Sequence, residues 1–229
     1  MQLLGIGLYT YFSIQHIQSA AYLARHAFAL EKEQTVSYDS DRDADIMACG
    51  CGSLFSSVAF LEALVNELFA DAARPDGGHL SLLPTAVREL VAELGATESV
   101  ERAPVLRKFA ILLRAAGLSP PPLGANPAQD LQVGLELRNN LTHYKAHWLD
   151  IGTPEMVRAG NLMASQLALR FKGKFAYRPG ISGPSSDNWL GHGCAEWVCQ
   201  TAIHYADRVS ETLGIVPLYD HVRPRLVTR

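Results

Sequence analysis

The ten residues from Glu136 to Lys145 carry the side chains best suited to chemistry in this sequence, among them an arginine, two asparagines, a histidine and a lysine. They stand in what is otherwise an apolar helical pattern, and polar groups on such a helix need a compensating role. Arg138 is a permanent cation, whereas His143 has the side chain that titrates near neutral pH. This combination suits chemistry on a phosphate group.

The spacing of these residues limits how they can act together. On a helix that turns about 100° per residue, Arg138 and His143 point roughly 140° apart, because five positions separate them. Asn139 and His143 share a face, and Arg138 and Thr142 share a neighbouring one. Arg138 and His143 can meet on one ligand if the helix end unwinds, if the long arginine reaches around, or if a second copy of the chain supplies the other half. The last alternative predicts a homodimer with a shared cleft.

The order of arginine, polar residue, three further residues and histidine, here Arg138-Asn139-x-x-x-His143, resembles the motif of the HEPN superfamily. Members of this superfamily are small all-α helical bundles. The setting is similar too, with an amphipathic helix upstream, a proline-rich loop, and the motif near a helix end. The resemblance covers about residues 45–171. It implies an all-α, HEPN-like helical bundle with additional N- and C-terminal helices, in one domain whose C-terminal helical extension spans about 187–229.

The resemblance also implies a function, namely metal-independent endoribonuclease activity in toxin or antiphage defence, with RNA as substrate and no cofactor. By resemblance, His143 is the general acid and base on the ribose hydroxyl or the leaving oxygen. Arg138 stabilises charge on the phosphate, and Asn139 orients either His143 or the phosphate. These roles are chemically consistent, because attack by a 2′-hydroxyl needs a proton acceptor of near-neutral pKa and a donor to the phosphate.

Other interpretations of the motif stay open. Many HEPN members are catalytically inactive and serve as nucleotide- or protein-binding dimerisation modules, and a purely structural helical bundle is a third alternative. Toxin-type members often carry a tyrosine two residues after the histidine, which a partner enzyme modifies. Here Tyr144 follows His143 directly and Lys145 takes the second position. An antitoxin or defence protein is still an implied partner, but this departure argues against a nucleotidyltransferase.

Structural roles for the motif are also conceivable. Arg138 and His143 can act as cations at a helix C-terminus, which favours positive charge, and Arg138 can pair with Glu62 or Glu136. Glu62 and Asn66 share a face of the upstream helix and either support Arg138 or lie at the bundle edge. The further supporting candidates are Thr142, Tyr144 and Lys145.

Apolar residues recur at helical spacing through most of the sequence, which predicts a bundle. Segments rich in glycine and proline, such as 74–78 and 120–122, separate the helices. No strand is expected in the tail after Leu213. The expected helices span about residues 6–32, 45–72, 85–94, 98–116, 127–144, 153–171 and 187–213, with a polar loop over 34–43.

Composition sets the broad class of the protein. Among 229 residues, 48% are apolar and 19% charged, as in an ordinary globular protein, and the net charge of -3 argues against broad nonspecific coating of nucleic acid. The apolar N-terminus lacks the basic start of a signal peptide and is too short for a span, which predicts a cytoplasmic protein without membrane attachment. Trp189 and Trp197 are expected to pack the core from the last helix. Four cysteines without zinc-site spacing are expected to be buried core residues: Cys49, Cys51, Cys194 and Cys199.

Overall fold

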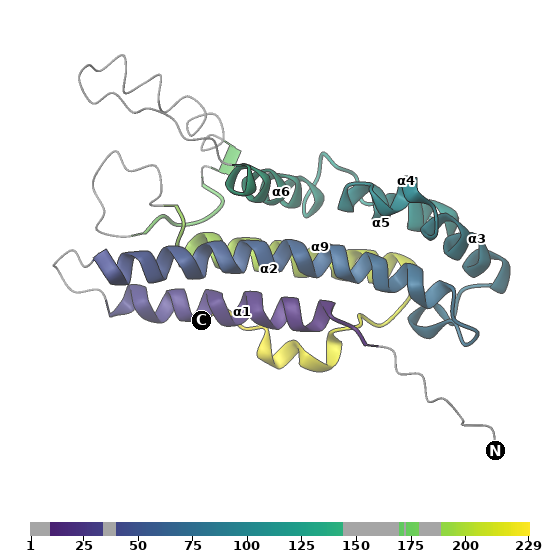
Figure 1. Cartoon of the computed structure of the whole chain (residues 1–229), viewed down its shortest axis with the longest axis horizontal. Coiled ribbons are helices and arrows are strands. Elements are labelled where there is room, and N and C mark those ends of the chain that lie inside the picture. The colour runs from purple at the N-terminus through teal and green to yellow at the C-terminus, as the bar shows by residue number, and fades with distance from the viewer. Residues whose placement is uncertain (1–9, 34–39, 144–169, 172, 179–188) are drawn as a thin grey trace, which may run out of the picture.

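The computed structural model describes residues 10–33, 40–143, 170–171, 173–178 and 189–229. Within these ranges the regular elements are α-helices and 3₁₀-helices, and no strand occurs, which confirms the all-α class. Three long helices form the centre: α1 (Ser13–Lys32), α2 (Ser40–Ala72) and α9 (His192–Leu213). The shorter helices α3 to α6 lie along one side of α2 and α9 (Figure 1).

Helices α1 and α2 lie side by side and run in opposite directions (Figure 1). The buried positions of α1 include Ala20, Ala24 and Ala27, small residues at the spacing of one helix face. On α2, Gly52 lies so close to Leu23 that a Cβ atom there would be 2.8 Å from a Leu23 methyl carbon. Small residues therefore let the two helices approach closely. Helix α1 ends at the predicted Lys32.

Helix α2 begins at Ser40, ahead of the predicted start near Asp45, so part of the expected polar loop is helical. Asp41 and Asp43 stand in its first turn, where carboxylates interact favourably with the helix dipole. Among the described helices, α2 is the one with the length and hydropathy of a membrane span, but 56% of its most apolar window is buried inside the molecule. The central helix of a bundle has the same properties, so they are weak evidence for a span.

The side layer contains η1 (Gly78–Leu80), α3 (Thr85–Gly95), α4 (Glu98–Glu101), α5 (Val105–Ala115) and α6 (Ala128–Thr142). The prediction of one helix over 98–116 is wrong, because the chain breaks between α4 and α5. Pro104 causes the break: it lacks an N–H, and its ring disfavours the helical conformation of Ala103. Pro104 then starts α5, since its carbonyl accepts hydrogen bonds from Arg107 and Lys108.

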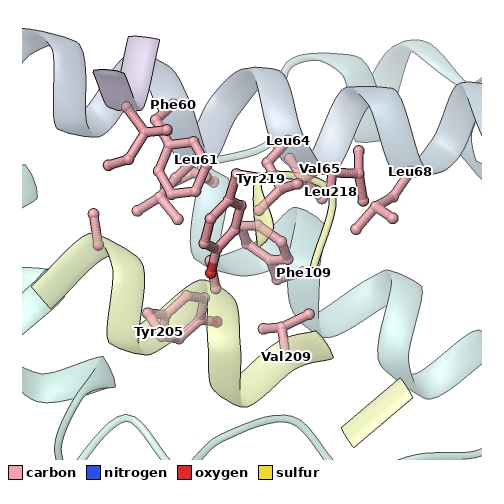
Figure 2. Close-up of a cluster of buried hydrophobic side chains, with 14 of the residues drawn as sticks. Phe60, Leu61, Leu64, Val65, Leu68, Phe109, Tyr205, Val209, Leu218 and Tyr219 are labelled. Carbon is pink, nitrogen blue, oxygen red and sulfur yellow. The ribbon is translucent and has the colours of Figure 1, made fainter. Parts of the chain in front are cut away.

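The main core lies where α2, α5, α9 and the C-terminal tail meet (Figure 2). Phe109 of α5 packs edge-on against Tyr205 of α9 at 5.4 Å between ring centroids, and Tyr219 of the tail packs edge-on against Phe60 at 5.2 Å. The tail forms η2 (Asp220–Arg225) and, as predicted, no strand. Because Tyr219 is fully buried, the tail is part of the core. The α2 side chains in this core include Phe60, Leu61, Leu64, Val65 and Leu68.

Helix α9 begins at His192, later than the predicted start at residue 187, which lies outside the described residues. A carboxylate oxygen of Glu31 on α1 accepts a hydrogen bond from the His192 N–H at 2.7 Å, which satisfies one free donor of the helix start. Trp189 consequently lies in the turn before α9 and not on the helix, whereas Trp197 is on it. The helix ends at the predicted Leu213.

Candidate functional site

Helix α6 positions the predicted motif. Its buried Leu137 packs in a small cluster with Leu54 of α2 and Val198 of α9. Gly134, one turn before Arg138, lies against α9 so closely that a Cβ atom would be 3.2 Å from Val198. The helix is therefore fixed against α2 and α9 by apolar contacts, and the motif occupies its last turn.

Arg138 is a half-buried cation whose Nε is buried without a hydrogen-bond partner. Arg88 also has a buried, unpaired Nε, but its terminal nitrogens bond to neighbouring oxygens. In the described part of the chain, no guanidinium nitrogen of Arg138 has such a bond. An unsatisfied buried donor costs about 1–3 kcal/mol, so the position of Arg138 needs a reason beyond stability.

The two carboxylates expected to neutralise Arg138 are paired elsewhere. Glu136 forms an ion pair with Arg170, and Glu62 lies 3.6 Å from the Lys108 ammonium. Asn66 also binds Lys108, accepting a hydrogen bond from Nζ at 3.1 Å. Neither Glu62 nor Asn66 contacts Arg138 among the described residues. They hold a buried lysine of α5 against α2 instead of supporting the motif.

His143 and Asn139 lie at the exposed end of α6. His143 is the C-terminal cap, and its N–H donates to the Asn139 carbonyl at 2.9 Å. The Thr142 hydroxyl donates to the Arg138 carbonyl at 2.9 Å, so it is used by the helix backbone. No contact joins the His143 ring to another described side chain. Tyr144 and Lys145 lie outside the described residues.

The helix stays regular up to the histidine, as the bond from His143 to Asn139 shows. Unwinding of the helix end, one of the three ways to bring Arg138 and His143 together, therefore does not occur in this structure. Their five-residue separation still directs them about 140° apart. Two of the three ways agree with this geometry. Either the long Arg138 side chain reaches around the helix, or a second copy of the chain supplies one of the two residues.

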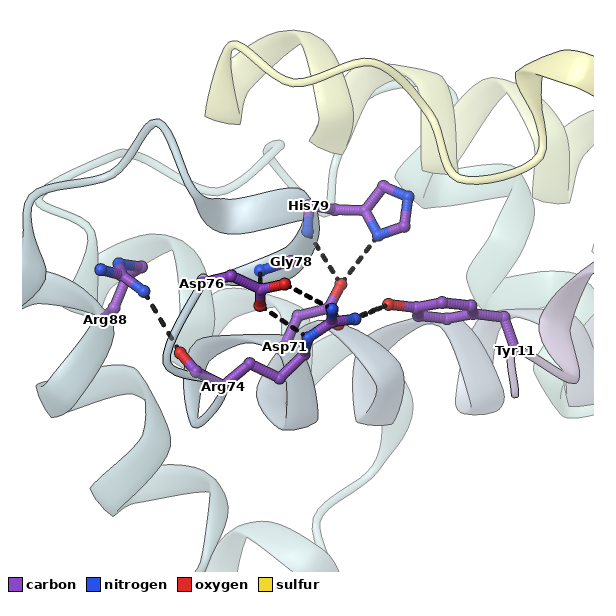
Figure 3. A network of polar contacts seen from close by, with 7 residues as sticks. All are labelled: Tyr11, Asp71, Arg74, Asp76, Gly78, His79 and Arg88. Atoms are coloured by element: carbon purple, nitrogen blue, oxygen red, sulfur yellow. Dashed lines mark hydrogen bonds and ion pairs between the residues drawn. The ribbon is translucent and has the colours of Figure 1, made fainter. Parts of the chain in front are cut away.

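A second polar cluster joins the end of α2 to the chain before α1 (Figure 3). No short sequence motif predicts this cluster. The Asp71 carboxylate is 1% exposed and accepts hydrogen bonds from the Tyr11 hydroxyl at 2.6 Å and from the His79 N–H and Nδ1 at 3.0 and 2.8 Å. Arg74 is 3.4 Å from the same carboxylate and forms two further bonds to Asp76. The one sequence signal was a carboxylate near the end of an otherwise apolar helix.

These contacts alter the acidities in this cluster. Burial acts to raise the pKa of Asp71, but hydrogen bonds from His79 and Tyr11 outweigh it and hold the pKa below its ordinary value. Burial and the hydrogen bond to Asp71 raise the pKa of Tyr11 to about 12. The loop glycines permit this arrangement: Gly78 has a φ of 48°, and a Cβ atom there would lie 2.4 Å from Asp71. Asp71 is thus enclosed by partners, as expected of a structural group.

None of the four cysteines forms a disulfide, and three of them are buried as expected, whereas Cys51 is only half-buried. Burial raises the pKa of the Cys199 thiol to about 12, which leaves little reactive thiolate at neutral pH. No cluster of three or more potential metal ligands occurs among the residues that the structure describes.

Of the polar clusters described, the end of α6 is the one that combines an unpaired cation with an exposed titratable group. No family model, no curated protein and no solved structure matches this chain. The resemblance to the HEPN motif consequently rests on the residues of α6 and their surroundings alone.

Proposed function

We propose that the chain is a HEPN-like, metal-independent endoribonuclease that acts as a homodimer in toxin or antiphage defence. RNA is the substrate, His143 the general acid and base, and Arg138 the cation that stabilises the phosphate. Asn139, which shares a helix face with His143, orients the histidine or the phosphate.

The observation that supports this proposal is the unpaired state of Arg138 in the helix turn that ends in an exposed histidine. The guanidinium has no hydrogen-bond partner among the described residues, and charge-assisted hydrogen bonds to phosphate are stronger than neutral ones. The nearby carboxylates that would compete for it are bound to Arg170 and Lys108. His143 is exposed, so it can approach a ribose without displacing another group.

The chemistry follows from these two groups. His143 removes the proton of a ribose 2′-hydroxyl while its oxygen attacks the adjacent phosphorus. The new O2′–P bond replaces the P–O5′ bond, which leaves a 2′,3′-cyclic phosphate on one fragment. The departing O5′ takes a proton from a protonated histidine and becomes a 5′-hydroxyl. Charge that builds up on the phosphate oxygens is stabilised by donors from Arg138.

The helix geometry supports the proposed homodimer. Since α6 stays regular and directs the two side chains apart, a twofold axis that pairs two α6 ends lets Arg138 of one protomer and His143 of the other face one phosphate. A shared site predicts that mixed dimers are active. When an Arg138 variant pairs with a His143 variant, one of the two sites takes its intact arginine from one chain and its intact histidine from the other.

The test is cleavage of an unstructured RNA by purified protein in EDTA. We expect His143→Ala to lower the rate by about 10²- to 10⁴-fold and Arg138→Gln by about 10²- to 10³-fold. His204→Ala, which removes an exposed histidine of α9, is the matched control and should leave the rate unchanged. The proposal fails if wild type and His143→Ala leave the RNA equally intact. Binding of RNA by both without cleavage would instead indicate an inactive binding module.

The dimer is tested by mixing the two inactive variants, Arg138→Gln and His143→Ala, after partial unfolding and refolding. If one site uses both chains, each mixed dimer contains one intact site and cleavage returns. If each site uses a single chain, no site is repaired and the mixture stays inactive. Loss of activity in both variants with no recovery would contradict the shared cleft while leaving the nuclease assignment intact.

A further inference from the structure

Residues 170–171 and 173–178 lie against α6 and are attached to it by two ion pairs. Arg170 binds Glu136, and Lys174 binds Asp130. Because Asp130 and Glu136 are six residues apart on α6, the two cations are held about 9 Å apart along the helix. Six residues also correspond to a rotation of about 120°, so the two ion pairs attach the segment to different sides of α6.

Arg170 is held on the side of α6 that His143 occupies. Glu136 precedes His143 by seven residues, nearly two full turns, so the two differ by only about 20° around the helix. Their separation along the axis is about 10 Å. A strand of nucleic acid whose scissile phosphate lies at His143 can thus place a neighbouring phosphate at Arg170.

The same segment presents an exposed aromatic ring on a buried aromatic base. Phe171 is 2% exposed and stacks with Phe175 at 5.4 Å between centroids. Tyr177 is 41% exposed and contacts both rings, at 6.2 and 5.8 Å. A ring held in place from behind and open to solvent is suited to stacking on a nucleobase, because every base has a π-face.

The ion pair of Arg170 by itself does not account for this arrangement. The Arg170 and Glu136 side chains are 46% and 32% exposed, and an ion pair of this exposure contributes little to stability. An exposed arginine can also exchange its carboxylate for a phosphate, which it binds with the same forked geometry. Alternation of cations with aromatic rings is the usual composition of surfaces that bind single-stranded nucleic acid.

We propose that Arg170 and Tyr177 form a subsite that binds the nucleotides next to the scissile phosphate of single-stranded RNA. Tyr177 stacks on an unpaired base, and Arg170 contacts the backbone. The inference rests on the proposed nuclease function, since that function places the RNA on α6. It adds that the substrate is open, unpaired RNA longer than a dinucleotide, because one phosphate cannot occupy both His143 and Arg170.

Binding is measured in the His143→Ala background by fluorescence anisotropy of a labelled, unstructured RNA of about ten nucleotides. We expect a further Tyr177→Ala change to weaken binding about tenfold, as loss of one stacked base does. Tyr177→Phe keeps the ring and should bind as the background does. Arg170→Gln should weaken binding several-fold and make its salt dependence less steep, by about 0.7 for one lost phosphate contact.

Matched controls come from α1 and from the residue that follows α4. Tyr22→Ala removes an exposed tyrosine of α1, and Arg102→Gln breaks an exposed ion pair with Glu98; both should leave RNA affinity unchanged. Thermal unfolding of each variant checks that the fold is retained. If Tyr177→Ala and Arg170→Gln bind like these controls, or if duplex RNA binds as tightly as single-stranded RNA, the subsite is refuted.

Cleavage with His143 intact separates this inference from the nuclease itself. Arg170→Gln should slow cleavage of the long RNA but not of a dinucleotide, which has no second phosphate to place on the subsite. If the variant cleaves the long RNA at the wild-type rate, the subsite is refuted while the proposed nuclease activity is unaffected. Absence of any cleavage by the wild type, with Tyr177-dependent binding retained, would overturn the nuclease and leave an RNA-binding surface.

Discussion

Two polar clusters of this protein differ in how completely their charged groups are paired. At the end of α2, Asp71 is buried among Tyr11, His79 and Arg74, all of which bond to it (Figure 3). At the end of α6, Arg138 has a buried nitrogen without a partner, and no contact joins the His143 ring to another described side chain. Both clusters place polar residues at the end of an apolar helix.

We infer from this difference that the first cluster is structural and that the second serves the proposed function. A buried carboxylate with several donors stabilises the fold, because its desolvation is offset by hydrogen bonds to the charged form. An arginine that is half-buried and unpaired lowers stability, and a folded protein retains such a group where it serves a ligand. The comparison predicts that substitutions in the first cluster act on stability and those in the second act on activity.

The largest effect on stability is expected from Asp71→Asn. An amide cannot accept all the hydrogen bonds that the carboxylate accepts, and it removes the charge that faces Arg74. Loss of one partner in a buried charged network costs about 3 kcal/mol, or roughly 6–12 °C in melting temperature for a chain of this size. Calorimetry measures the change. Asp220→Asn, in a half-exposed ion pair with Arg223, is the control and should cost far less.

The contribution of Asp71 to the free energy of unfolding depends on pH, and the shift of its pKa determines the direction. Because the folded-state pKa is lowered, the contribution of the ionised carboxylate is complete above its unfolded-state pKa of about 3.9. It is lost as the pH falls through the lower folded-state value. The stability difference between wild type and Asp71→Asn should therefore narrow below about pH 4. A difference that stays constant from pH 7 to pH 2 would show that the charge of Asp71 is irrelevant.

Sequence patterns predicted the helices better than the contacts between them. The spacing of apolar residues located α1, α2 and α9 because each buries one continuous face. The break at Pro104 was missed, since the apolar pattern continues on both sides of it. The start of α9 was placed too early because it depends on Glu31, a residue from another part of the chain.

At the candidate site, too, local sequence patterns predict the helix but not its contacts with distant segments. The placement of Arg138 and His143 at a helix end follows from local pattern. The partners of Glu62 and Asn66 do not, because they depend on α5 lying opposite α2 and bringing Lys108 between them. The bond between Tyr11 and Asp71 spans 60 positions and has no counterpart in local spacing. Long-range polar pairs thus need the structure, whereas helix faces do not.

Arg138→Met is expected to stabilise the protein, by less than Asp71→Asn destabilises it. Methionine keeps the apolar stem and removes the unsatisfied nitrogen, so the free energy of unfolding should rise by about 1 kcal/mol while RNA cleavage is lost. Arg88→Met is the matched control, because Arg88 has a buried Nε too but bonds to the Arg74 carbonyl and the Thr85 hydroxyl. We expect Arg88→Met to destabilise the protein. Equal destabilisation by both substitutions, in urea unfolding, would mean that Arg138 is a structural residue like Arg88.

The smallest effect on stability is expected from His143→Ala, at the end of α6. The exposed ring contacts no described side chain, and the backbone bond to Asn139 does not depend on the side chain, so the free energy of unfolding should change by no more than about 0.5 kcal/mol. His79→Ala, which removes a donor to buried Asp71, should cost roughly 1–3 kcal/mol. Urea unfolding of both variants at neutral pH compares the two histidines directly. If His143→Ala destabilised the protein as much as His79→Ala, its side chain would be a structural cap of α6, and a loss of RNA cleavage in that variant could no longer be assigned to proton transfer.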